Sequence, residues 1–119
     1  MSDADCGVTN TLKVIGSKWT VLILRDLMED KKRFGELQRS LTGISPKTLS
    51  IRLQELEREK IVKKKIFAEI PLHVEYSLTE KGHSLNEVIC AMRNWGECHR
   101  KKSGGLPSKS NRYSASSND

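Results

Sequence analysis

The chain has 119 residues, a net charge of +6 at neutral pH and 36% hydrophobic residues, which predicts a single domain with a modest core. No apolar run approaches the roughly 20 residues that a membrane-spanning helix needs. The first ten residues lack the basic and apolar regions typical of a signal peptide, so we expect a cytoplasmic protein with no membrane partner.

Positive charge is concentrated in two parts of the chain. Residues 46–65 carry a net charge of +4 and residues 100–119 another +4, whereas residues 1–45 carry +1 and residues 66–99 carry −3. A basic surface indicates an anionic partner, usually nucleic acid, and a merely solvated face is the alternative.

Three helices are predicted in the first 41 residues. Residues 9–15 read as a short helix that ends at Gly16. Residues 18–29 carry apolar side chains at helical spacing and predict a mostly buried helix. A shorter helix begins at Phe34, and a tight turn, Thr-Gly-Ile, follows it.

The stretch GISPKTLSIRL, residues 43–53, begins the next helix. Ser45 is a favourable N-cap, and Pro46 suits the first helical position because its missing N–H has no intrahelical partner there. One narrow stripe of leucines is expected to face inward: Leu49, Leu53 and Leu56. Two helices joined by a glycine-containing turn predict a helix-turn-helix.

A hairpin and a further helix follow. Two strand-like runs, residues 61–67 and 73–78, flank a turn at Pro71. Thr79 is expected to cap one long amphipathic helix of about twenty residues. This order of elements predicts a winged helix-turn-helix, an α+β and mainly α fold. A helix of that length exceeds what one small domain can cover, which indicates a homodimer.

The C-terminal segment differs in composition from the rest of the chain. Residues 103–119 are rich in Ser, Gly and Asn, with almost no large apolar side chains, so a disordered basic tail is expected there. Residues 1–102 are predicted to form one DNA-binding and dimerisation domain.

Four blocks carry a family resemblance: IGSKWTVLIL, RFGELQRSLTGISPKTLSIRLQELE, VEYSLTEKG and MRNWG. They resemble the HxlR-type winged-helix transcription regulators, relatives of the MarR group, and the resemblance extends over residues 6–98. It implies a homodimeric, cytoplasmic, sequence-specific regulator of double-stranded DNA, without enzymatic activity or cofactor. We expect a repressor that binds an inverted-repeat operator.

The chain departs from the family pattern at two positions. Lys60 stands where the resembled family has a glycine at the end of the recognition helix. Because the left-handed cap conformation costs a lysine about 1 kcal/mol, the helix is expected to end differently and tilt the wing. Ser17 replaces the second of two glycines before the Lys-Trp pair.

Residues at the start of the recognition helix and on the wing are the candidates for DNA contact. They are Ser45, Pro46, Lys47, Thr48, Ile51, Arg52, Lys63, Lys64, Lys65 and His73. Arg52 suits bidentate contact with guanine, and pairing with Glu55 at i, i+3 is the alternative. On a strand at most two of the three lysines can meet one line of phosphates, and protection of an edge strand is their alternative role. His73 reads as an ordinary wing residue, not a metal ligand.

Three cysteines, Cys6, Cys90 and Cys98, are expected to be free thiols. Cys90 and Cys98 lie eight residues apart, about 12 Å along one helix, which is too far for a disulfide. Cys6 stands where several members of the resembled family carry a cysteine that senses quinones, aldehydes or oxidants. The resemblance also makes a bridge to Cys98 of the partner subunit conceivable, with Cys90 of the partner subunit as second choice. An ordinary buried thiol is the alternative, and no metal site is expected.

The leading hypothesis is a dimeric repressor whose DNA affinity is switched by thiol chemistry at Cys6. A regulator that senses a small ligand at the dimer interface, without thiol chemistry, is the rival. An enzyme is disfavoured because the sequence offers no nucleophile–base pair or Gly-rich phosphate loop. The basic segment 46–65 argues against a pure protein-docking module.

Overall fold

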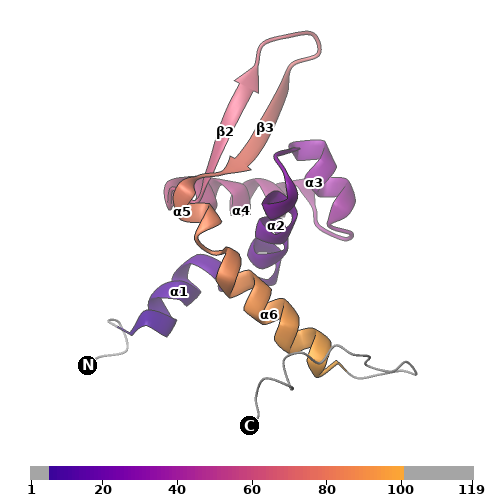
Figure 1. Ribbon diagram of the computed structural model, residues 1–119. Helices are drawn as coiled ribbons and strands as arrows, with labels where there is room; N and C mark the ends of the chain where they lie inside the picture. The colour runs from indigo at the N-terminus through magenta and orange to yellow at the C-terminus, as the bar shows by residue number, and fades with distance from the viewer. Residues whose placement is uncertain (1–5, 101–119) are drawn as a thin grey trace. The chain divides into compact units, whose positions relative to one another are not determined.

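The computed structural model describes residues 6–100, which form helices and a small antiparallel sheet (Figure 1). In chain order the elements are α1 (Gly7–Ile15), α2 (Lys18–Glu29), β1 (Lys32–Arg33), α3 (Phe34–Ser40), α4 (Pro46–Arg58), β2 (Val62–Phe67), β3 (His73–Leu78), α5 (Glu80–His83) and α6 (Asn86–Cys98). The chain divides into two compact units, and the boundary follows Leu85. None of the described helices is long and apolar enough to cross a membrane.

The junction between α1 and α2 is tight. A Cβ on Gly16 would lie 2.5 Å from the carbonyl oxygen of Leu12, so a side chain does not fit there. Ser17 is the N-cap of α2, and its hydroxyl accepts a hydrogen bond of 3.4 Å from the backbone N–H of Thr20. Serine at this position therefore has a local role as a helix cap.

The predicted helix-turn-helix is confirmed. Gly43 adopts φ of 94° in the turn between α3 and α4, a conformation that favours glycine. Ser45 caps α4 by accepting a hydrogen bond of 3.1 Å from the N–H of Thr48. The inward leucine stripe of α4 is 0–2% exposed and joins a core formed with α2 and α3; its fully buried members are Ile23, Leu24, Leu37, Leu41, Leu49, Leu53, Leu56 and Ile61.

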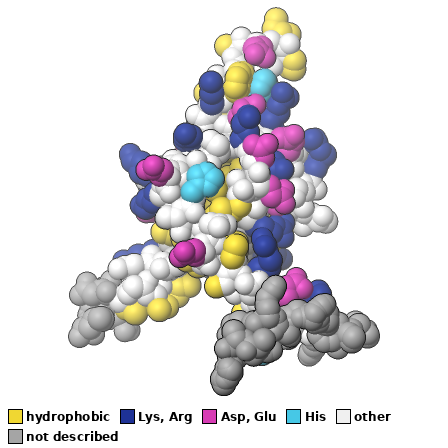
Figure 2. Space-filling view, in the orientation of Figure 1, with side chains coloured by type: hydrophobic (Ala, Val, Ile, Leu, Met, Phe, Trp, Pro, Cys, Tyr) yellow, Lys and Arg dark blue, Asp and Glu magenta, His cyan; other side chains and the backbone are white. Residues whose placement is uncertain are grey.

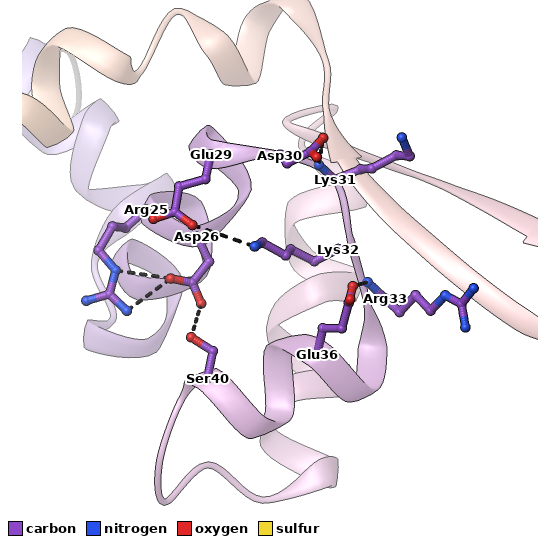
Figure 3. Close-up of polar contacts among 9 residues, drawn as sticks. All are labelled: Arg25, Asp26, Glu29, Asp30, Lys31, Lys32, Arg33, Glu36 and Ser40. Atoms are coloured by element: carbon purple, nitrogen blue, oxygen red, sulfur yellow. Dashed lines mark hydrogen bonds and ion pairs between the residues drawn. The ribbon is translucent and has the colours of Figure 1, made fainter.

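A buried carboxylate connects α2 to α3 (Figure 3). Asp26 is 5% exposed, and its Oδ2 accepts a hydrogen bond of 2.6 Å from the hydroxyl of Ser40. The guanidinium of Arg25 lies 3.0 Å from Oδ1 of the same carboxylate. These contacts satisfy the charge that burial would otherwise leave unpaired.

The sheet has the strand order β1-β3-β2, with antiparallel pairing throughout. In β2 and β3 the structure confirms the two predicted runs. Tyr76 and Leu78 lie buried on the same, inner face of the sheet, because alternate residues of a strand share a face. The two-residue strand β1 was not predicted. Together with the helix-turn-helix, the β2–β3 hairpin makes the fold a winged helix-turn-helix, as expected.

The prediction that α4 ends without the left-handed cap conformation at Lys60 is wrong. Lys60 adopts φ of 64°, and the N–H groups of Lys60 and Ile61 donate to the carbonyl oxygens of Glu57 and Leu56. This is the pattern of a Schellman cap, with lysine in the position that usually holds glycine. Because the hydroxyl of Thr79 also donates to the Lys60 carbonyl at 2.6 Å, a tertiary contact supports the conformation.

The single long helix predicted after Thr79 is also wrong, because α5 ends at His83 and α6 begins at Asn86. The hydroxyl of Ser84 donates a hydrogen bond of 2.6 Å to the Lys81 carbonyl, which competes with regular helical bonding. Thr79 still caps α5, through the N–H of Gly82. The predicted tail, residues 103–119, lies outside the described residues.

Candidate nucleic-acid interface

The recognition helix α4 has one buried and one exposed side. The exposed side lies opposite the leucine stripe and is formed by Lys47, Ile51, Gln54 and Arg58. These residues recur at the i, i+4, i+7 and i+11 spacing of one helical face. An exposed helix face with two cations, an amide and an aliphatic side chain suits the edges and phosphates of a DNA groove.

Gln54 was absent from the sequence-based candidates. It is exposed and lies one turn after Ile51 on the same side of α4. Glutamine can pair bidentately with adenine in the major groove. The helical spacing relative to the three leucines was a signal that could have identified it.

Arg52 lies at the edge of that exposed side. Its Nη1 is 2.8 Å from Oε1 of Glu55, and its side chain is 31% exposed. Its Nε is buried without a hydrogen-bond partner among the described residues. The i, i+3 pair that was the alternative role of Arg52 is therefore present, and Glu55 holds the guanidinium along the helix.

The first turn of α4 carries a small hydroxyl cluster. The Ser45 hydroxyl donates a hydrogen bond of 3.0 Å to Oγ1 of Thr48. Ser45, Pro46 and Lys47 are exposed, whereas Thr48 is half-buried. The helix therefore begins with exposed polar groups at the end where backbone N–H groups favour phosphate.

The three wing lysines do not share one face of the sheet. Lys63 and Lys65 are paired with Ser77 and Glu75 of β3, and these four residues lie on the outer face of the sheet, away from the core. Lys64 is paired with Tyr76, which lies on the inner face. Nζ of Lys64 lies 3.9 Å from Oε1 of Glu57 on α4. Alternation predicted that at most two of the three lysines share one face, and these two are Lys63 and Lys65.

His73 lies at the start of β3 and stacks on the ring of Phe67, with ring centroids 4.6 Å apart. Its Nε2 is 3.9 Å from Oε2 of Glu75. Within residues 6–100, no group of three or more His, Cys, Asp or Glu side chains is arranged to hold a metal ion.

The tip of the wing is apolar and exposed. Ile70 is fully exposed and Leu72 is 65% exposed, and Figure 2 shows hydrophobic side chains gathered at that end of the hairpin. Residues 66–72 contain one acidic residue, Glu69, and no Lys or Arg. The cations of the wing therefore lie near its base, close to the helices.

Cys6 immediately precedes α1 and is partly exposed. The backbone N–H groups of Thr9 and Val8 favour the thiolate and lower the pKa of Cys6 below its ordinary value. The sulfur does not form the close side-chain cap that Ser17 forms at α2. The start of α1 therefore makes this thiol more acidic than a cysteine in an unstructured peptide.

The other two cysteines lie on α6, and all three are free thiols. Sγ of Cys90 lies 3.7 Å from Oδ1 of Asn86, one turn earlier. On the same helix Met92 and Trp95 remain 46% and 59% exposed.

Comparison with known proteins identifies the same architecture. The model of a family described as HxlR-like helix-turn-helix matches residues 14–103. The HTH-type transcriptional regulator YdeP of Bacillus subtilis (strain 168) is 39% identical over 97 residues, 82% of this chain and 76% of YdeP.

Solved structures agree with this match. The redox regulator HypR in its oxidized form has a TM-score of 0.77 at 39% identity, covering 82% of this chain and 100% of that chain. The reduced form of the transcriptional regulator YodB from B. subtilis has a TM-score of 0.70 at 35% identity, covering 83% and 98%.

Proposed function

The chain belongs to the HxlR-like helix-turn-helix family, and we propose that it is a cytoplasmic, homodimeric repressor whose DNA affinity is switched by thiol modification at Cys6. The DNA-binding fold comes with the family. The operator, the dimer and the switch are parts of the proposal, and each rests on a separate feature of the molecule.

The observation that carries the proposal is the exposed side of α4. In a helix-turn-helix the second helix enters the major groove, and its N-terminal part contacts base edges. Lys47, Ile51 and Gln54 are exposed there, whereas the opposite side is closed by core leucines. Lysine supplies charge for phosphate, and the other two side chains suit base edges.

Exposed apolar residues support a dimer. On α1 Val8 and Leu12 are 68% and 55% exposed, and on α6 Met92 and Trp95 are likewise exposed. Large apolar side chains that recur on a helix surface mark sites of association. We propose that α1 and α6 pair with their counterparts across a two-fold axis, which gives an inverted-repeat operator with half-sites about one DNA turn apart.

The proposed switch follows from the position of Cys6 at the N-terminus of α1. A two-fold dimer reads its operator only while its two recognition helices keep the spacing of successive major grooves. Modification at an end of the interface helix biases that spacing. Two routes are open: alkylation of the Cys6 thiolate by a quinone, or a disulfide with Cys98 or Cys90 of the partner subunit, in which two thiols lose two electrons and two protons to the oxidant.

The experiment is a DNA-binding titration with and without diamide. We expect diamide to change the affinity of the wild-type protein at least several-fold, and Cys6→Ser to bind normally when reduced but to lose most of the response. Non-reducing gels separate the routes, because a disulfide gives a covalent dimer that is also lost in Cys98→Ser or Cys90→Ser. If Cys6→Ser responds like the wild type, a small ligand bound at the dimer interface replaces thiol chemistry as the signal.

A further inference from the structure

The outer face of the sheet carries cations on both sides of its central strand. Strand pairing places Lys65 and Arg33 on either side of Glu75. One step along the same face, Lys63 lies opposite Ser77, and Lys31 lines the same hollow as both residues. Because β1 and β2 are separated by β3, the cations lie about 10 Å apart across the sheet.

The side chains of β1, and of Lys31 just before it, point alternately to the two faces of the sheet. In Figure 3 the side chains of Lys31 and Arg33 extend to the same side, away from the Asp26 cluster, whereas Lys32 points toward Glu29. Nζ of Lys32 lies 3.6 Å from Oε1 of Glu29. Lys32 and Lys64 are thus the inward lysines, each paired with a glutamate, and their sequence neighbours Lys31 and Lys63 point outward.

The charge on the outer face is not compensated. None of Lys31, Arg33, Lys63 and Lys65 forms a salt bridge with another residue among those that the structure describes. The one carboxylate between them, Glu75, lies 3.9 Å from His73. An open hollow of about 480 Å³ lies on this face and is lined by Lys31, Lys63, Lys65, Glu75 and Ser77, together with Lys64 and Phe67. The row Lys31–Ser77–Lys63 contains no acidic group.

We propose that this row, defined here as the sheet seat (Lys31, Ser77 and Lys63), binds a phosphate of the DNA backbone beside the groove that α4 enters. The two lysines approach one phosphate from opposite sides, and the hydroxyl of Ser77 donates a hydrogen bond between them. This rests on the proposed DNA-binding function and extends it to Lys31 and Ser77.

The shape of the seat favours DNA over a small phosphorylated molecule. Sites for small ligands enclose most of the ligand surface, whereas this hollow lies on an open sheet face bordered by exposed lysines. A polymer backbone needs no enclosure, because neighbouring contacts hold it in place. Lys63 of the seat lies on β2, which begins four residues after α4 ends.

The chain supplies a matched pair of double variants for the test. Lys31→Gln/Lys63→Gln removes both cations of the sheet seat. The control Lys32→Gln/Lys81→Gln removes the same charge from two lysines outside the seat: Lys32 pairs with Glu29, and Lys81 donates to the Glu59 carbonyl. We measure the affinity of each full-length variant for the DNA that the wild-type protein binds, over a series of salt concentrations. Each phosphate contact contributes about 0.9 to the slope of log K against log salt.

We expect Lys31→Gln/Lys63→Gln, the outward double variant, to lower the slope by about 0.9 per protomer, and the control double variant to leave it unchanged. Glu75→Gln removes the carboxylate beside the seat and should strengthen binding. Equal slopes for the two double variants overturn the proposal. A second outcome also overturns it. Calorimetry would show that the wild-type protein binds inorganic pyrophosphate and that the outward double variant does not, while the salt slope of DNA binding is the same for both proteins. If the wild-type protein shows no salt-dependent DNA binding at all, the proposed function itself fails.

Discussion

The carboxylate of Asp26 and the hydroxyl of Ser40 are joined by a hydrogen bond of 2.6 Å, which connects α2 to the last residue of α3. Asp26 is buried, and within residues 6–100 its carboxylate otherwise contacts only the guanidinium of Arg25 on its own helix. The hydrogen bond therefore fixes the first helix of the helix-turn-helix on the domain core.

Ser40→Ala should lower the free energy of unfolding by about 1–3 kcal/mol, because it leaves one oxygen of a buried carboxylate unpaired. Urea unfolding measures the change. Ser50→Ala on α4 is a control, because Ser50 is half-buried but forms no hydrogen bond to a buried charge within residues 6–100. Equal losses in the two variants would show that the Asp26 contact contributes nothing specific.

Lys60→Gly should raise the free energy of unfolding by about 1 kcal/mol, because glycine adopts the positive φ of Lys60 without steric cost. Lys60→Ala removes the same charge but keeps the Cβ, so it should give no comparable gain. Thermal unfolding of the three proteins measures the difference. A gain of equal size in both variants would assign the effect to charge instead of backbone conformation.

Gly82→Ala should destabilise the fold, because a Cβ there would collide with the carbonyl oxygen of Ile61 and press on Leu78. Both contacts belong to the backbone or core, so neither can move away freely, and we expect a loss of about 1–3 kcal/mol. Gly35→Ala is the matched control, since its Cβ would make only an ordinary contact of 3.5 Å with Arg39. Chemical denaturation of both variants tests the contrast, which disappears if α5 does not pack on Ile61.

The alkylation of Cys6 should show a lower pH midpoint in the folded protein than in the unfolded one. The N–H groups of Thr9 and Val8 lower the thiol pKa only while α1 is folded, so the thiolate persists to lower pH there. The rate of reaction with iodoacetamide, measured against pH in a Cys90→Ser/Cys98→Ser background with and without urea, gives both midpoints. If the folded and unfolded proteins gave the same pH midpoint, the start of α1 would not be what makes Cys6 reactive.

Most helices and both long strands could be predicted from the sequence because their signals are local. The leucine spacing of α4, the Ser-Pro start and the alternation of β3 are each readable within a few residues. Two features depended on tertiary contacts instead. Lys60 keeps the left-handed cap because Thr79, distant in sequence, donates a hydrogen bond to its carbonyl. Gly82 is needed in α5 because a Cβ there would collide with the Ile61 carbonyl.

The site was predictable in part. Alternation limited the wing to two lysines per face, but only the strand register identifies Lys63 and Lys65 as the outward pair. Lys31 could not be placed from the sequence, because the strand that follows it, β1, is two residues long and exists only through its pairing with β3. Gln54 was not predicted, although its helical spacing from the core leucines was enough to identify it. The spacing allowed Arg52 either to contact DNA or to pair with Glu55, and only the side-chain geometry shows the pair.

The central claim, that the exposed side of α4 reads base sequence, is tested most directly with Gln54→Ala. The protein is first footprinted on the DNA upstream of its own gene, and the protected duplex and a shuffled duplex of equal length are then titrated by fluorescence anisotropy. Loss of one base contact costs about 1–3 kcal/mol on the specific site. We therefore predict that Gln54→Ala weakens binding to the protected duplex by about 5- to 150-fold and leaves binding to the shuffled duplex unchanged. Equal affinities of the wild-type protein for both duplexes, or equal losses of the variant on both, would contradict base reading by this face.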